Sequence, residues 1–183
     1  RMKPISIRLC GFGGQGVVLS AVILGTAAVT KRGLYAVQTQ SYGSEARGGQ
    51  CQAELIISDQ PINSPMVDKK DLLIALSQSA LDRYLPSLRA GGTLIIDPQL
   101  VKNTHSCQER VIPVPATETA VHLGSRISAN MVVLGFLQQS TGLLTKEDLV
   151  AVIKELTRPR FLDTNLRAVD EGTKLAQGVT VEV

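Results

Sequence analysis

The chain has no tryptophan, and its 183 residues include only three phenylalanines, three tyrosines and three cysteines. Nucleic acid is a poor candidate partner, because base-stacking platforms need aromatic side chains and the net charge of +3 forms no stripe of Lys or Arg. No C-x-x-C pair occurs, which argues against a self-contained iron-sulfur cluster or structural zinc site. Cys10, Cys51 and Cys107 are widely spaced, as expected for free thiols in a reducing cytosol, so we expect a cytoplasmic protein.

Long apolar runs are also missing. The longest one, residues 17–29, is interrupted by Ser20, Gly25 and Thr26, so we expect no membrane span. The first four residues lead directly into an apolar run without a charged leader, and we therefore expect no secretion signal. With 44% apolar and 19% charged residues, the composition is that of an ordinary globular protein, and the length suits one domain over residues 1–183.

A glycine-rich loop near the start of the chain is the most informative feature that is present. The apolar run 5–10 leads into Gly11, Gly13, Gly14, Gln15 and Gly16, and a second apolar stretch follows from residue 17. This order predicts a strand, a tight loop and a helix that ends at Gly33. Glycines let a ligand approach the bare main chain, and a helix N-terminus offers unpaired N–H groups to an anion.

The loop matches the dinucleotide pattern G-x-G-x-x-G, which taken alone favours NAD or NADP. A dinucleotide site should also place an Asp or Glu roughly 20 residues further on, to hold the ribose hydroxyls. That region holds Gln38 and Gln40 instead, and no Lys-Ser/Thr follows Gly16 as a P-loop would require. Three interpretations remain: a dinucleotide, another phosphate-bearing ligand or substrate fragment, and a purely structural turn.

A second glycine-rich loop follows the expected strand 34–39. With the first strand and helix this strand would form a βαβ unit with neighbouring parallel strands. Both loops would then leave the carboxyl ends of neighbouring strands, where ligands of open α/β sheets gather, and lie side by side. The candidate residues of the second loop are Ser41, Tyr42, Ser44, Arg47, Gly48 and Gly49. Arg47 suits a charged ligand or a partner chain, and the alternative is a solvated surface loop.

The rest of the chain continues the α/β alternation. Strands are expected at 51–58, 71–76 and 93–97, with an edge strand at 111–115 because Pro113 cannot donate to a ladder. A helix is expected at 80–88, ended by residues 90–92, and further helices are expected to begin at residue 117 and to span 131–139. Two more should follow, one that begins after a cap at Thr145 and one at 163–176 with Asp163 as its cap. The tail 179–183 could dock as an edge strand or remain loose. The predicted fold is a three-layer α/β/α sandwich with a mostly parallel open sheet and a Rossmann-like start.

No catalytic constellation accompanies the two loops. His105 and His122 lie far apart in sequence and outside both loops, so we interpret them as ordinary surface or helix residues. Cys10 ends a buried strand without a neighbouring base, and Cys51 is only a somewhat better thiol nucleophile. We assign no catalytic residue and no metal ligand, and we expect this chain to form only part of an active site.

Four segments together resemble a known family: G-F-G-G-Q-G-V-V-L, A-V-Q-T-Q-S-Y-G-S-E-A-R-G-G, the apolar strand before Ile57-Ser58-Asp59, and D-L-L-I-A-L-S-Q. They resemble the gamma subunit of 2-oxoacid:ferredoxin oxidoreductases, which corresponds to the third domain of single-chain pyruvate:ferredoxin oxidoreductases. The resemblance covers essentially the whole chain. The wording from Gln38 to Gly49 looks most like the 2-oxoglutarate or broad 2-oxoacid type, and a similar subunit occurs in indolepyruvate oxidoreductases.

The resemblance implies a part in the CoA-dependent oxidative decarboxylation of a 2-oxoacid, which gives acyl-CoA, carbon dioxide and reduced ferredoxin. In that family thiamine diphosphate, magnesium and the iron-sulfur clusters are held by other subunits. The implied partners are alpha and beta subunits, with a ferredoxin-like delta subunit as a further candidate, and ferredoxin as the electron acceptor of the complex. The residues of both loops would face CoA or partner subunits: Gly11, Gly13, Gly14, Gln15, Gly16, Ser41, Tyr42, Ser44, Arg47, Gly48 and Gly49.

Two hypotheses from other classes stay open on the sequence alone. One is a self-contained NAD(P) dehydrogenase that uses the first glycine loop. The other is a homo-oligomeric ligand-binding module without enzyme partners. Exposed docking loops would also allow the isolated chain to form a homodimer.

Overall fold

The computed structural model describes residues 1–43, 49–64 and 67–183, which form one six-stranded sheet with helices on both faces. The strands are β1 (Ile5–Phe12), β2 (Tyr35–Tyr42), β3 (Gln50–Ser58), β4 (Lys70–Ala75), β5 (Leu88–Ile96) and β6 (Arg110–Pro113). The helices are α1 (Val17–Arg32), α2 (Gln78–Tyr84), α3 (Ala116–His122), α4 (Ala129–Thr141), α5 (Lys146–Leu156) and α6 (Leu162–Leu175). Short 3₁₀ turns occupy Leu85–Ser87, Arg126–Ser128 and Pro159–Phe161.

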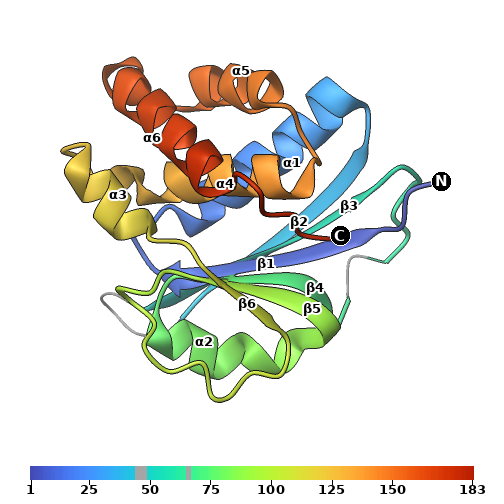
Figure 1. Ribbon diagram of the computed structural model, residues 1–183. Helices are drawn as coiled ribbons and strands as arrows, with labels where there is room; N and C mark the ends of the chain where they lie inside the picture. Colours follow the sequence, from blue (N-terminus) through green and yellow to red (C-terminus); the bar gives the residue numbers. More distant parts are fainter. Residues whose placement is uncertain (44–48, 65–66) are drawn as a thin grey trace.

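The helices are divided unevenly between the two faces of the sheet. Figure 1 shows α1 and α3 to α6 above the sheet and α2 below it. The predicted three-layer α/β/α class is therefore confirmed. In the part of the chain that the structure describes, no helix combines the length and apolarity needed to cross a bilayer.

The sheet order is β2-β3-β1-β4-β5-β6, and this order corrects the expected βαβ start. β1, β4, β5 and β6 are parallel to one another, whereas β3 is antiparallel to both β1 and β2. β1 and β2 therefore run in the same direction but are separated by β3. The physical reason is the short connection between β2 and β3, since strands joined by a short loop pair antiparallel.

Alternating side chains give β1 and β3 one apolar and one polar face. Ile7, Leu9 and Leu55 belong to the main core under α1 and α4. On the opposite face, the Glu54 carboxylate accepts from the Arg8 guanidinium at 2.6 Å and from the Lys70 ammonium at 2.7 Å. Burial acts to raise the pKa of Glu54, but hydrogen bonds from Lys70 and Thr39 and the two positive charges hold that pKa below its ordinary value.

Several expected element boundaries are confirmed and others are wrong. Thr145 caps α5 in a capping box with Asp148, and Ser77 caps α2 by accepting from the Ala80 amide. Residues 90–92 do not end a helix: they lie inside β5, because α2 already stops at Tyr84. Asp163 is not a cap but a residue of the first turn of α6.

The C-terminal tail is docked without forming a strand. The Val181 amide donates to the Ser140 carbonyl oxygen at 2.8 Å, and the Val181 side chain is buried. The Arg110 guanidinium of β6 donates to the Thr180 carbonyl oxygen. The tail therefore lies against α4 and beside the outer strand of the sheet.

Helices α4 and α6 cross with their backbones in contact. A Cβ on Gly135 of α4 would collide with the Val169 carbonyl oxygen of α6, and a Cβ on Gly172 of α6 would collide with the Val132 carbonyl oxygen of α4. Neither glycine has a positive φ, so space and not backbone conformation requires them. Two small residues thus set the distance between these helices.

Replacement of Gly172 by alanine should lower the free energy of unfolding. The exposed-helix preference for Ala over Gly is worth about 0.5–1 kcal/mol, but overpacking against rigid backbone costs about 1–3 kcal/mol or more. Urea unfolding of Gly172→Ala compared with Gly13→Ala tests this, because an added Cβ at Gly13 meets open space. Equal stability of the two variants would contradict the close helix crossing.

Candidate functional site

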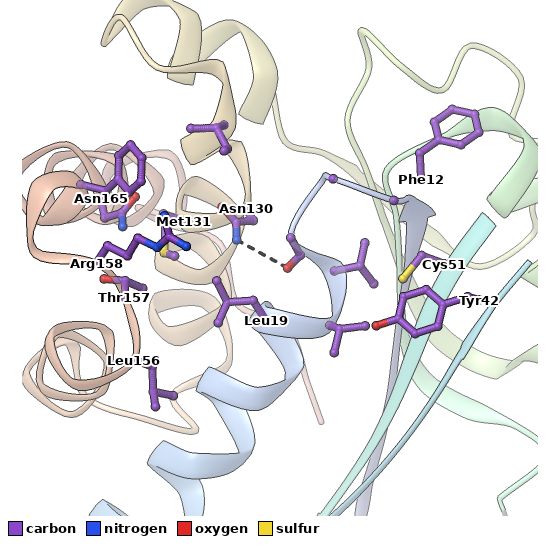
Figure 2. Close-up of a pocket in the computed structure, with 17 residues that line it drawn as sticks. Phe12, Leu19, Tyr42, Cys51, Asn130, Met131, Leu156, Thr157, Arg158 and Asn165 are labelled. Carbon is purple, nitrogen blue, oxygen red and sulfur yellow. Dashed lines mark hydrogen bonds between the residues drawn. The ribbon is translucent and has the colours of Figure 1, made fainter. Parts of the chain in front are cut away.

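The glycine loop, residues 13–16, joins the end of β1 to the start of α1, as the sequence predicts. Gly16 is the N-cap of α1 with a φ of 74°, in the left-handed region that favours glycine. A Cβ there would also collide with the Asn130 side chain, whose Nδ2 lies 3.5 Å from the Gly16 carbonyl oxygen (Figure 2). Among the described residues no side chain caps this end of α1, so its first N–H groups remain available to a ligand.

Gln15 braces the loop from inside. Its Oε1 accepts from the Phe12 amide at 2.6 Å, and its Nε2 donates to the Leu76 carbonyl oxygen at 2.9 Å. A Cβ at Gly11 would collide with the Gln15 side-chain oxygen, so this arrangement also requires glycine at position 11. One side chain therefore ties the ends of β1 and β4 together. The predicted contact of Gln15 with CoA or a partner stays a prediction.

The second loop lies against the first, although the strands before them are not neighbours. The Gly13 amide donates to the Gly49 carbonyl oxygen at 3.2 Å. Ser41 and Tyr42 point to opposite faces of the sheet: the Ser41 hydroxyl accepts from Gln52 on the polar face, whereas Tyr42 lines the pocket next to α1. Ser44, Arg47 and Gly48 lie outside the described residues, so their predicted contacts remain predictions.

A pocket among the described residues, here called the loop pocket, surrounds the N-terminal turn of α1 and has a volume of about 460 Å³. Figure 2 shows Thr157, Arg158 and Asn165 on one side of this turn and Tyr42 and Cys51 on the other. The lining comprises Phe12, Gly13, Gly14, Gly16, Val17, Val18, Leu19, Tyr42, Cys51, Ile127, Asn130, Met131, Leu156, Thr157, Arg158, Phe161 and Asn165. Four of the predicted loop residues, Gly13, Gly14, Gly16 and Tyr42, are thus brought together.

The lining of the loop pocket suits a ligand that has an anionic group at one end and a neutral, partly apolar part elsewhere. Within the described ranges the Arg158 guanidinium has no ion-pair partner, and it faces a pocket that also receives the positive end of the α1 dipole. Asn165 is buried, and its Oδ1 accepts from the Ser128 hydroxyl at 3.1 Å, which fixes the amide. The apolar side chains Leu19, Leu156 and Phe161 form much of the remaining wall.

Neither cysteine near the loops is suited to nucleophilic chemistry. Burial raises the pKa of the Cys10 thiol to about 12, and the charge of Arg8 lowers it only in part. Burial also raises the pKa of the Cys51 thiol, which is 4% exposed in the wall of the loop pocket. Both thiols therefore stay protonated near neutral pH.

A second pocket of about 350 Å³ lies on the other side of Gly14 and includes Gln15, Asp97, Thr117 and Arg126. The Asp97 carboxylate is already used within the fold, since it accepts from the Thr117 amide and hydroxyl and from the Gln99 amide. The predicted histidines lie elsewhere, exposed and outside the linings of both pockets. His105 contacts Asp82, whose pKa is lowered by hydrogen bonds from Gln78 and from His105.

Arg158, Asn130 and Asn165 are the site residues that sequence reasoning missed. They come from α4, α6 and the segment after α5, more than a hundred residues from the glycine loop. None belongs to a motif with a chemical signature. The only sequence signal was indirect: the nearly all-apolar pattern of residues 131–137 predicts a packed internal helix, without indicating its neighbours.

Loss of the Gln15 brace should loosen the glycine loop. Gln15→Ala removes two hydrogen bonds, worth about 1–3 kcal/mol together, and should reduce the hydrogen-exchange protection of the Phe12 amide. Gln108→Ala is the matched control, because Gln108 is exposed and bonds only to the Ser106 carbonyl two residues away. If urea unfolding and exchange are the same for both variants, Gln15 does not hold the loop.

Comparison with known proteins places this geometry in a family. Residues 6–175 match the family model of pyruvate ferredoxin/flavodoxin oxidoreductase. The 2-oxoglutarate synthase subunit KorC of Methanothermobacter marburgensis is 46% identical over 176 residues, covering 92% of this chain and 95% of that protein. Ketoisovalerate oxidoreductase subunit VorA of the same organism is 30% identical over 96% of this chain but 37% of VorA. Indolepyruvate oxidoreductase subunit IorB of Methanothermobacter thermautotrophicus is 28% identical over 91% of this chain and 95% of IorB.

Solved structures agree with this placement. The gamma subunit of the keto/oxoacid ferredoxin oxidoreductase from Geobacter sulfurreducens superposes with a TM-score of 0.84 at 36% identity, covering 96% of this chain and 99% of that one. The 2-oxoglutarate:ferredoxin oxidoreductase of Magnetococcus marinus shares the fold with a TM-score of 0.87 at 24% identity, and this chain spans 99% of its own length but 32% of that chain. The chain therefore belongs to the pyruvate ferredoxin/flavodoxin oxidoreductase family, as a gamma-type subunit of the 2-oxoacid:ferredoxin oxidoreductases.

Proposed function

We propose that this chain is the gamma-type subunit of a 2-oxoglutarate:ferredoxin oxidoreductase and that its loop pocket faces CoA and the partner subunits. The assignment of 2-oxoglutarate as the substrate rests on the 46% identity to KorC over nearly the full length of both chains. The relatives named for ketoisovalerate and indolepyruvate oxidoreductases are less similar. The complex would convert 2-oxoglutarate and CoA to succinyl-CoA and carbon dioxide and pass the electrons to ferredoxin.

The chemistry of the loop pocket supports CoA as the ligand that approaches it. CoA carries phosphates at one end and a neutral pantetheine arm at the other. Arg158 and the first N–H groups of α1 supply positive potential for a phosphate, while Asn130 and Asn165 offer amides along the wall. The Magnetococcus marinus relative, which shares the fold, was solved with 2-oxoglutarate, CoA and succinyl-CoA bound.

The exposed apolar side chains support the proposal that partner subunits bind on the same face as CoA. Ten large hydrophobic side chains are exposed among the described residues, and five of them line the loop pocket: Phe12, Leu19, Tyr42, Ile127 and Leu156. Tyr42 and Ile127 are each 66% exposed. An apolar patch of this kind that surrounds a ligand pocket is typical of a protein interface.

Thiamine diphosphate, magnesium and the iron-sulfur clusters are proposed to reside on alpha, beta and ferredoxin-like delta subunits. In the described part of the chain no group of three or more His, Cys, Asp or Glu side chains could hold a metal ion, so we assign no residue here to one. The residues of this chain would bind and orient CoA and exclude water beside the reacting centre. We propose no catalytic step for any of them.

The competing NAD(P) hypothesis is less well supported by the fold. In a dinucleotide site the strand after the first helix lies next to the first strand, so that its terminal acid reaches the ribose. Here β3 lies between β1 and β2, and β2 ends in Ser41 and Tyr42. A ribose-binding group at the end of β2 would therefore be displaced by one strand from the glycine loop.

Substrate choice can be measured on the native complex, isolated through a tag on this chain. We expect thiamine-binding and iron-sulfur partners to co-purify, and the complex to reduce ferredoxin with CoA and 2-oxoglutarate faster than with pyruvate, 2-oxoisovalerate or indolepyruvate. A preference for another 2-oxoacid would overturn the substrate assignment. Micromolar binding of NADH or NADPH to the isolated chain, measured by calorimetry, would favour the dehydrogenase hypothesis instead.

Arg158→Gln should weaken CoA binding by the complex. Loss of a charge-assisted hydrogen bond costs about 1.5–3 kcal/mol, which corresponds to a rise of roughly 10- to 100-fold in the KM for CoA. The KM for the 2-oxoacid should not change. Arg167→Gln is the matched control, because Arg167 is exposed and does not line the pocket. An unchanged KM for CoA in Arg158→Gln would remove Arg158 from the proposed site.

A further inference from the structure

The outer edge of β2 is free among the described residues, since β2 ends the sheet and pairs only with β3. The strand is eight residues long, and its register with β3 is continuous from Tyr35 to Tyr42. The sequence YAVQTQSY contains no proline, no glycine and no charged residue. Natural proteins usually protect an edge strand with such features, because a free edge readily pairs with another strand.

The opposite edge of the sheet is protected in the expected way. β6 has only four residues and ends at Pro113, which has no N–H to donate. The guanidinium of Arg110 is engaged by the Thr180 carbonyl oxygen of the docked tail. The contrast between the two edges indicates that the open edge of β2 is covered in the assembled protein.

Helix α1 continues the uncharged surface next to this edge. From Val17 to Thr30 the helix has no charged residue, yet Val29 is 44% exposed. A groove of about 320 Å³ runs between α1 and β2 and is lined by Val22, Gly25, Thr26, Val29, Thr30, Ala36, Gln38 and Leu55. The groove and the outer edge of β2 are together called the edge surface.

We propose that the edge surface is an interface between two copies of this chain, in which the two β2 strands pair antiparallel about a two-fold axis perpendicular to the sheet. A two-fold axis brings each residue close to its own equivalent, so such an interface tolerates a neutral surface and opposes a charged one. The edge surface has no Lys, Arg, Asp or Glu. A neutral edge is compatible with its own equivalent across such an axis, which makes a second copy the proposed occupant, and the proposal does not depend on the proposed function.

The spacing of the elements also fits. α1 lies over β2 and β3, and neighbouring strands are about 4.8 Å apart. A helix seated between β2 and β3 is then about one strand spacing from the axis, which brings the two α1 helices to about 10 Å from each other. Packed helices have axes about 8–10 Å apart, so strand pairing would place the two α1 helices in contact.

The side chains favour one register. Equivalent faces of the two sheets must coincide, so the axis passes through a residue and not between two residues. With Thr39 on the axis, Gln38 lies opposite Gln40 of the second copy. Within one strand Gln38 Nε2 donates to Gln40 Oε1 at 3.1 Å, and the remaining amide groups can bond across the axis. Ala36 then lies opposite Tyr42 of the second copy, whose ring covers the groove where Ala36 and Gly25 leave space.

The oligomeric state tests the interface directly. We expect the wild-type chain to sediment as a dimer and Gln38→Lys to raise the dimer Kd at least tenfold, because the two lysines would lie on the same face, one residue on either side of the axis. Gln177→Lys makes the same change in charge at an exposed position outside the edge surface and should leave the dimer intact. A monomeric wild-type chain, or a dimer that Gln38→Lys does not weaken, would overturn the proposal.

Cross-linking tests the register in the same protein. Opposed residues of antiparallel strands have Cα atoms about 4.5–5.5 Å apart, which is within the range for a disulfide. Thr39→Cys should therefore give a disulfide-linked homodimer under mild oxidation, whereas Thr180→Cys, at an exposed position of the tail, should not. A cross-link from Thr39→Cys to a different subunit of the tagged complex would show another occupant and refute the proposal.

Discussion

The amide of Gln15 is the contact on which the geometry of the site depends. It joins the Phe12 amide at the end of β1 to the Leu76 carbonyl just beyond β4, the strand next to β1 in the sheet. The loop that it holds must then pass into α1 through Gly16, which fixes where the helix begins and where its positive end points. Gln15 therefore holds the glycine loop in position without lining the loop pocket itself.

The sequence predicted local features well, because their causes are local. Gly33 ends α1 in the left-handed conformation, Thr145 caps α5, and Pro113 marks an edge strand, as their residue types require. The position of β3 between β1 and β2, antiparallel to both, could not be predicted in the same way. The alternation of apolar and polar residues indicates a strand but not its direction in the sheet. Arg158 and Asn165 were missed because tertiary packing alone brings them to the glycine loop.

The incomplete character of the site has a physical basis in this chain. Positive potential, amides and apolar walls suit binding, whereas burial keeps both nearby thiols protonated and the Asp97 carboxylate is bonded within the fold. A subunit with these properties can hold one reactant and leave the chemistry to another chain. Membership of a family of multisubunit oxidoreductases fits this division of roles.

The crossing of α4 and α6 also limits how the loop pocket can change shape. Gly135 and Gly172 place backbone against backbone where the helices cross, so no side chain lies between them at that point. Asn165 belongs to α6 and Asn130 to α4, so the helix crossing fixes the spacing between the backbones that carry these two amides. Adjustment to ligands of different size is then left to the exposed side chains of the pocket, such as Arg158 and, on the opposite side, Tyr42 at the end of β2.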